Sequence, residues 1–487
     1  MQHRTVHEKP KSLFGLRQPA AAFMMFSLLS IFQGCLVQEP EWKPENSGIL
    51  PNRWVKSSNG QSTKVKDGWI QEFQDADLDK LIKEAIENNP TLKAAESRLE
   101  ASRQGTLLSN ATRIPSISGN SSVSESGSKV RDSDGSWEPW QNSSNSGIGL
   151  SASWEIDVWR RLSNNYKAVL ADYEAQKADL KAAKLSLAAN TARAWFNLIA
   201  ARQQMVLAEQ TRDSFQRNYR ITERKYKAGD PSATALSVNF GRNQIASAER
   251  QFLDRKLSRD EARRSLELIL GRYPAAQIED RETLPMLTED VPAGLPSELL
   301  NRRPDLIASA NRITSSAARA ASERMSLLPS IRLNAGSSQS ASSIELKELI
   351  QNPSSIAQNV AISVSQPIFG RAAMKASAKQ ALARNEAAIY TYRSTALQAL
   401  REVESALDSA DALAQQEPFL ERELEQAILA ENQATRDYSQ GIIEILSVLE
   451  AQRRAFNARS RMISFQNERL QNRISLYLAL GGDFATE

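Results

Sequence analysis

A strand that leads directly into a very long helix is the feature that most constrains how this chain folds. Residues 148–157 alternate between apolar side chains and Gly, Ser or acidic ones, the period-2 pattern of a strand with one apolar face. The apolar side consists of Ile148, Leu150, Ala152, Trp154 and Ile156. From Leu150 to Ala228 there is no Gly or Pro, and helix-forming residues dominate after Arg161. A helix over 165–228 would be about 96 Å long, far beyond ordinary globular helices.

The second half of the chain repeats this unit. Tyr226-Lys-Ala-Gly229 returns as Tyr438-Ser-Gln-Gly441, an offset of 212 residues. Similar offsets relate Ile114-Pro-Ser-Ile117 to Leu328-Pro-Ser-Ile331, and 158–161 to 368–371. A steady offset of this size indicates duplication. Each half is therefore predicted to contain a helix, a strand, a loop, a strand, a long helix, a Gly turn and a returning helix. Pro418 is the one interruption in the second long helix.

The strands of the second half alternate as well. Ile331, Leu333 and Ala335 lie on one side of the first, and Val360, Ile362 and Val364 on one side of the second.

The repeats and their flanks divide the sequence into five parts. Residues 1–34 are predicted to be a signal peptide, and 35–66 a lipid-anchored, extended N-terminal segment. Repeat 1 covers 67–273, with strands at about 115–130 and 146–157 and long helices at about 162–270. Residues 274–296 form a Pro-rich linker. Repeat 2 covers 297–482, with strands at about 329–340 and 357–368 and long helices at about 371–480.

The first 34 residues resemble a bacterial lipoprotein signal. A basic region that includes Arg4 and Arg17 precedes an apolar stretch, 19–32, which is too short to span a bilayer as a helix. The stretch ends at Gly34-Cys35, which predicts cleavage before Cys35 and acylation of this residue. Leu36 follows, and by analogy with lipoproteins this favours the outer membrane. The alternative is an incidental Cys in an ordinary signal peptide.

Composition excludes several function classes. Cleavage would remove four basic residues and one acid, so the formal net charge of +4 would fall to +1. This is not the charge of a nucleic-acid-binding protein. Both His residues lie before Cys35, and Cys35 is the single Cys. No disulfide can form within one chain, and zinc sites and His-dependent catalysis are excluded from the mature chain. We expect no enzyme activity and no cofactor.

No segment after residue 34 has the 18 or so consecutive apolar residues of a transmembrane helix. If the chain crosses a membrane, it must therefore do so as a closed β-barrel. Four strands cannot close one, since the smallest single-chain membrane barrels have about eight. Three copies would supply about twelve strands, with an apolar face for lipid and a polar face for a wet lumen. The alternative is a soluble coiled-coil protein with two β-hairpins.

The chain resembles the outer-membrane efflux proteins, the TolC-like family. It is most similar to the lipoprotein branch of this family, which works with resistance-nodulation-division pumps. The segments that carry the resemblance are 77–79 with 88–90, Ser-Trp-Glu-Ile-Asp at 153–157, Gly-Leu-Pro-Ser-Glu-Leu-Leu-Asn-Arg-Arg-Pro-Asp-Leu at 294–306, 446–453 and 479–482. The resemblance implies a mainly α fold with a small β part. A homotrimer would form a twelve-stranded barrel in the outer membrane on a long periplasmic α-helical tunnel. It further implies a passive exit duct that docks on a periplasmic membrane-fusion adaptor and an inner-membrane pump.

The resemblance also assigns sites. The turns at Gly229 and Gly441 would form the periplasmic tip that meets the adaptor. Leu446 and Glu450 lie four residues apart on one helix face and would form an apolar ring and an acidic ring at the aperture. The alternative is that Leu446 packs between helices and Glu450 is a solvated surface charge.

Three features depart from the family pattern. The first tip, from Gly229 to Leu236, is about two residues longer than is usual. Ser237 and Ser447 are uncharged where relatives hold the tip closed through polar contacts. Arg160 replaces the usual Gly before Arg161, whereas the second repeat keeps Gly370.

The leading function hypothesis is export of drugs or other toxic small molecules. Two alternatives remain. One is an exit duct for metal ions or for type I secreted proteins, although the absence of His after Cys35 is a weak argument against a dedicated soft-metal path. The other is a trimeric lipoprotein scaffold with no open lumen.

Overall fold

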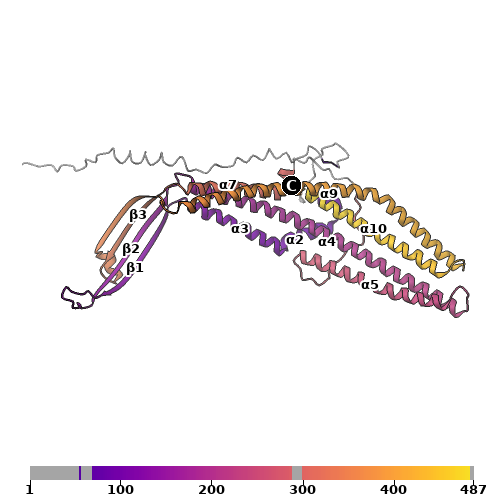
Figure 1. Ribbon diagram of the computed structural model, residues 1–487. Coiled ribbons are helices and arrows are strands. Elements are labelled where there is room, and N and C mark those ends of the chain that lie inside the picture. The colour runs from indigo at the N-terminus through magenta and orange to yellow at the C-terminus, as the bar shows by residue number, and fades with distance from the viewer. Residues whose placement is uncertain (1–53, 56–67, 288–298, 483–487) are drawn as a thin grey trace, which may run out of the picture. The chain divides into compact units, whose positions relative to one another are not determined.

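The computed structural model describes residues 54–55, 68–287 and 299–482 (Figure 1). They divide into two compact units. One unit combines 109–166 with 317–385 and holds the strands; the other combines the described parts of 43–108, 167–316 and 386–487 and is helical. The signal peptide, Cys35 and most of the N-terminal segment and linker predicted from the sequence lie outside the described residues.

The first unit contains a four-stranded antiparallel sheet in the order β1-β2-β3-β4 (Figure 1). Its strands are β1 (Ser116–Ser128), β2 (Gln141–Glu155), β3 (Ser330–Ala341) and β4 (Ser355–Ser365). Three of them match the predicted positions within two or three residues. The start of β2 was predicted too late, at about 146, because 141–146 is a run of Gln, Asn and Ser with low strand propensity. Pairing of Ser128 with Gln141 extends the strand through this run.

The second unit is built around two pairs of helices. In the first pair, α4 (Arg161–Lys227) is followed by α5 (Ala235–Ile269), and in the second, α9 (Arg371–Ser439) is followed by α10 (Ile445–Ala479). With 67 residues, α4 is about 100 Å long. Helices α4 and α9 begin in the first unit and continue into the second, whereas α5 and α10 lie entirely in the second. Pro418 does not end α9; it is exposed, so water can satisfy the carbonyl that loses its helical partner.

Shorter elements complete both units. The remaining helices are η2 (Trp69–Phe73), α2 (Ala76–Asn88), α3 (Pro90–Ala111), α6 (Leu299–Arg302), α7 (Pro304–Met325) and α8 (Leu346–Gln351). The six-residue α8 lies between β3 and β4 and was not predicted from the sequence.

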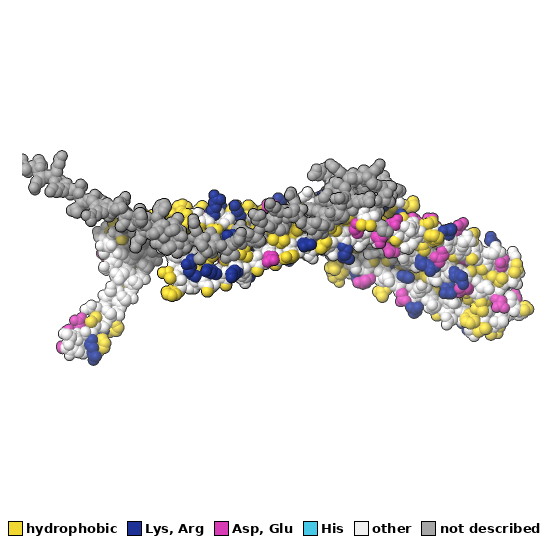
Figure 2. Space-filling view, turned by 45° about the horizontal axis from the view of Figure 1, so that its top comes forward, with side chains coloured by type: hydrophobic (Ala, Val, Ile, Leu, Met, Phe, Trp, Pro, Cys, Tyr) yellow, Lys and Arg dark blue, Asp and Glu magenta, His cyan; other side chains and the backbone are white. Residues whose placement is uncertain are grey.

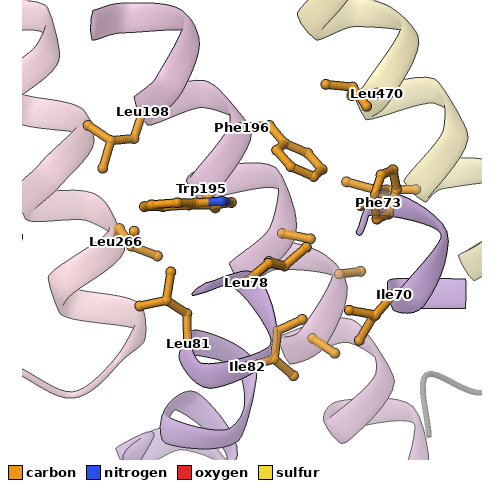
Figure 3. Close-up of a cluster of buried hydrophobic side chains, with 14 of the residues drawn as sticks. Ile70, Phe73, Leu78, Leu81, Ile82, Trp195, Phe196, Leu198, Leu266 and Leu470 are labelled. Atoms are coloured by element: carbon orange, nitrogen blue, oxygen red, sulfur yellow. The ribbon is translucent and has the colours of Figure 1, made fainter. Parts of the chain in front are cut away.

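The main core of the helical unit combines Leu, Ile and Ala side chains with five aromatic ones (Figure 3). Trp69 stacks on Tyr477 with ring centroids 5.7 Å apart, and Phe73 meets Phe196 edge-to-face at 5.0 Å. Trp195 also lies in this core and donates through Nε1 to Asp75, which caps α2. The core joins η2, α2, α4, α5 and α10, so η2 near the start of the described chain packs against its last helix.

Candidate functional site

The sheet has two chemically different faces, and its register settles which residues share each face. Directly paired residues point to the same side. Ala152 pairs with both Ile117 and Ala335, and Ala335 pairs with Val360. The same face holds Val123, Ile148, Leu150, Trp154, Ile331, Leu333, Ile356, Ile362 and Val364. The apolar sides predicted for the three strands therefore lie on one face, and many of their side chains are more than half exposed.

The opposite face is lined by small polar residues. Ser118 pairs with Ser151, which pairs with Gly336, and their neighbours include Asn120, Gly149, Ser153, Asn334, Ser338 and Asn359. Ser153 Oγ donates to Asn334 Oδ1 at 3.0 Å across the strands. In Figure 2 most of the visible sheet surface is neither hydrophobic nor charged.

Both outer strands of the sheet are long and uncovered. Within the described residues, β1 pairs only with β2, and β4 pairs only with β3. All residues of β1 and β4 are exposed. An open edge of this length offers a row of backbone donors and acceptors to another strand, and soluble proteins usually protect such edges. The large exposed apolar face of the sheet is a second surface that a soluble protein would usually bury.

Similar bends join the strands to the long helices in both halves. Gly370 precedes α9 with φ +86°, and Arg160 precedes α4 with φ +60°. Arg160 therefore keeps the left-handed backbone of the Gly that it replaces, a conformation that is costly for a residue with a Cβ. Asp157 caps α4 by accepting from the backbone nitrogens of Leu162 and Ser163 at 2.9 and 2.8 Å. The predicted departure at Arg160 thus leaves the bend in place.

The two Gly turns close the helix pairs in the same way. Gly229 and Gly441 both have φ +76°, and an added Cβ would meet no atom within 4 Å at either. Their requirement for Gly is therefore one of backbone conformation. Beyond Gly229 the chain donates back from Asp230 N to Lys225 O at 3.0 Å, and beyond Gly441 from Ile442 N to Asp437 O at 2.9 Å.

The first turn is longer than the second. It covers 228–234, against 440–444 in the second half, so the extra length expected from the sequence is present relative to the second repeat. Asp230 accepts from both the backbone nitrogen and the hydroxyl of Ser232. Ser237 forms a reciprocal capping box with Thr234, so it stabilises the start of α5.

Leu446 and Glu450 lie on the exposed side of α10. The Leu446 side chain is 44 % exposed, while Ile445, Val448 and Leu449 are buried with Phe215 and Tyr438. Leu446 is therefore not packed between helices in the single chain. Glu450 accepts from Arg453 at 2.7 Å and from Arg454 at 2.8 Å. Hydrogen bonds from Arg454 and Arg453 lower the pKa of Glu450, which stays ionised at neutral pH.

The two arginines are residues that the sequence analysis missed. The spacing Glu450, Arg453, Arg454 is i, i+3, i+4, which brings charges together on a helix face, so the sequence contained the signal. The sequence predicted an acidic ring at Glu450. The guanidinium groups of Arg453 and Arg454 outweigh the single negative charge of Glu450. Cys35, the predicted lipidation site, lies outside the described residues.

Two comparisons of the sequence with known proteins identify the family of the chain. A family model for "outer membrane efflux protein" matches residues 81–272 and 295–482. The chain belongs to the outer-membrane efflux protein family. The pyoverdine export outer-membrane protein OpmQ of Pseudomonas aeruginosa is 29 % identical over 478 residues, 95 % of this chain and 98 % of OpmQ. The cation efflux system protein CusC of Escherichia coli O6:H1 is 30 % identical over 440 residues, 89 % of this chain and 93 % of CusC.

A solved structure agrees with this assignment. The outer-membrane channel MtrE of Neisseria gonorrhoeae, in its open state, superposes with a TM-score of 0.75 at 27 % identity, covering 93 % of this chain and all of MtrE. The efflux protein is therefore a channel of the outer membrane and not an enzyme. Among the described residues, no helix combines the length and apolarity needed to cross a bilayer.

Proposed function

We propose that this efflux protein is the outer-membrane duct of a tripartite system and that it works as a homotrimer. The observation that carries this proposal is the open sheet, with two unpaired edges and one apolar face. Pairing β1 of one copy with β4 of the next would satisfy both edges. Three copies would then form a barrel of about twelve strands, with lipid outside and the Ser- and Gly-rich face inside.

Family membership and the predicted lipoprotein signal support the other parts of the proposal. Acylated Cys35 would anchor each chain in the outer membrane. The helices α4, α5, α9 and α10 would form the periplasmic tunnel, and the turns at Gly229 and Gly441 would dock on a membrane-fusion adaptor linked to a resistance-nodulation-division transporter. Solutes would pass passively, driven by that pump. Drugs and other toxic small molecules are the proposed cargo.

Relatives keep a second cargo class open. CusC is named as a cation efflux protein, and OpmQ as an exporter of pyoverdine. A deletion strain separates these classes. Export of organic solutes predicts increased susceptibility to drugs and dyes, whereas export of cations predicts increased susceptibility to metal salts. No change in either panel, together with no accumulation of a fluorescent dye, would favour the non-conducting scaffold.

The aperture is tested by conductance in planar bilayers. Leu446→Ala combined with Glu450→Ala should raise the conductance of the purified protein. It removes a narrow apolar ring and the carboxylate that holds Arg453 and Arg454 in place. The control is Glu249→Ala with Leu253→Ala, a more exposed pair of the same two residue types four residues apart on α5. Equal conductance of both double variants and the wild type would remove Leu446 and Glu450 from the aperture.

A further inference from the structure

The arginines of α10 are not all paired alike. Four of them have a carboxylate partner from another element: Arg459 with Glu431, Arg461 with Glu423, Arg469 with Glu417, and Arg473 with Glu72. These four carboxylates are all different, so each pair is electrically balanced. Such pairs leave little net field at the surface of the helix.

Arg453 and Arg454 differ because they share one carboxylate. Glu450 Oε2 lies 2.7 Å from Arg453 Nη2, and Glu450 Oε1 lies 2.8 Å from Arg454 Nε. The side chains of the two arginines are 61 % and 74 % exposed. Glu450, Arg453 and Arg454 together therefore carry a net charge of +1 at this turn of α10 in every copy of the chain.

This charge lies on the same helix stripe as the aperture residues. Leu446, Glu450, Arg453 and Arg454 stand at i, i+4, i+7 and i+8. The opposite side of the turn is fixed against α4, because Gln452 accepts from Asn218 at 2.8 Å and donates to Ser214 at 3.1 Å. A rotation of α10 that would turn the arginines away would break these buried contacts.

We infer that the constriction at Leu446 and Glu450 prefers anions, and that the exported solutes include organic anions such as carboxylates. The inference rests on the proposed function, since it requires this stripe to face the lumen. Repetition around a three-fold axis would give a ring with two guanidinium groups for every carboxylate. Rings of Arg or Lys are the usual means of selecting anions in pores.

The expected effect is measurable at low ionic strength. A local potential of about one kT at the ring would enrich anions about threefold and deplete cations by the same factor. The effect should weaken in 1 M salt, where the Debye length falls to about 3 Å from about 10 Å at 0.1 M. The measurement is the reversal potential in planar bilayers under a KCl gradient, converted to the Cl⁻ to K⁺ permeability ratio.

Four proteins separate the possible outcomes. The wild type should show a permeability ratio above one. Arg453→Ala with Arg454→Ala should lower it to below one, because Glu450 remains, whereas Glu450→Gln should raise it. Arg250→Ala is the control, an arginine 72 % exposed on α5 with its own carboxylate, Asp254, and it should leave the ratio unchanged.

The failure of this inference can be told apart from failure of the proposed function. Each protein is also measured in a Leu446→Ala background, so that a closed aperture does not hide the result. Conductance with a ratio of one or below in the wild type, or a ratio insensitive to loss of both arginines, would overturn the anion preference and leave the duct intact. Absence of conductance in all backgrounds would overturn both.

Discussion

Tyr438 donates a hydrogen bond to Thr222, and this bond ties the two halves of the chain together near their turns. The two hydroxyl oxygens are 2.9 Å apart. Thr222 gives its own proton to Asn218 O at 3.0 Å, so Tyr438 must be the donor. Lys225 lies 4.5 Å from the centroid of the Tyr438 ring and adds a cation–π contact. Thr222 and Tyr438 are both buried.

The direction of this bond predicts unequal effects for its two partners. Thr222→Val should leave a buried phenol donor without an acceptor, at a local cost of about 1–3 kcal/mol, whereas Tyr438→Phe should cost about 1 kcal/mol. Hydrogen exchange in 218–229 and 434–445 should therefore accelerate more in Thr222→Val. Tyr390→Phe, at an exposed position of α9, is the control. Equal exchange in all three variants would contradict the assigned donor.

At the bends before α4 and α9, introducing a Gly and removing one should have opposite effects on stability. Arg160→Gly should stabilise the protein by about 0.5 kcal/mol, because relief of about 1–2 kcal/mol in the left-handed region exceeds the extra entropy of an unfolded Gly. Gly370→Ala should destabilise by about 1 kcal/mol, because φ at this position is +86°, a backbone conformation that is costly for a residue with a Cβ. No steric clash should add to this cost, since no atom lies within 4 Å of the added Cβ. Melting temperatures in detergent measure both changes. A lower melting temperature for Arg160→Gly would mean that the Arg160 side chain stabilises the bend.

Glu267 predicts a specific loss of stability in acid. Its carboxylate is 3 % exposed and accepts from the backbone nitrogens of Ala276, Gln277 and Ile278 at 2.6–3.0 Å. Burial raises the pKa of Glu267, but these hydrogen bonds and the charge of Arg272 outweigh it, so the pKa is lowered. The stabilisation is therefore complete at neutral pH and is lost as pH falls below about 4.3, the ordinary Glu value.

Glu267→Gln tests this contribution. The amide would turn an N–H toward a backbone donor, so the variant should lose about 1–3 kcal/mol at pH 7 and much less at pH 3. Melting temperatures at the two pH values give the difference. Glu261→Gln is the control on the same helix, because the Glu261 side chain is 68 % exposed and pairs with Arg264. A similar loss at both pH values would indicate that shape, and not charge, matters at residue 267.

Neighbouring residues of β4 should respond differently to charge. Val360 lies on the apolar face and Ala361 on the polar face. If the apolar face contacts lipid, Val360→Lys should cost about 2–4 kcal/mol near the bilayer midplane and reduce the assembled protein in outer membranes. Ala361→Lys should assemble normally and alter conductance. Normal assembly of both variants would contradict a lipid-facing role for Val360.

The sequence predicted much of this architecture because its signals are local. Alternation in the strands, absence of breakers in the long helices, and the repeated Tyr-x-x-Gly turns each follow from backbone preferences of a few residues. The pairing of apolar sides across β1–β4 then requires only antiparallel order, and the register of Ala335 with Ala152 and Val360 agrees with it.

Features that depend on pairing between distant segments were not predictable in the same way. The start of β2 at Gln141 is imposed by its partner Ser128, and the Gln/Asn/Ser run alone reads as a loop. The joint burial of Asn218 and Gln452 depends on α4 meeting α10, more than two hundred residues apart. The proximity of Arg453 and Arg454 to Glu450 could have been predicted from their spacing. Their excess positive charge is evident only in the structure, where each of the other four arginines of α10 has its own carboxylate partner.

Native mass spectrometry of protein gently extracted from outer membranes tests the central claim most directly. We expect a trimer of chains that begin at Cys35, each with added acyl mass, because the edges of the four-stranded sheet need partners. A monomer that retains residues 1–34, or one without lipid in the soluble fraction, would contradict the shared barrel and the anchor together.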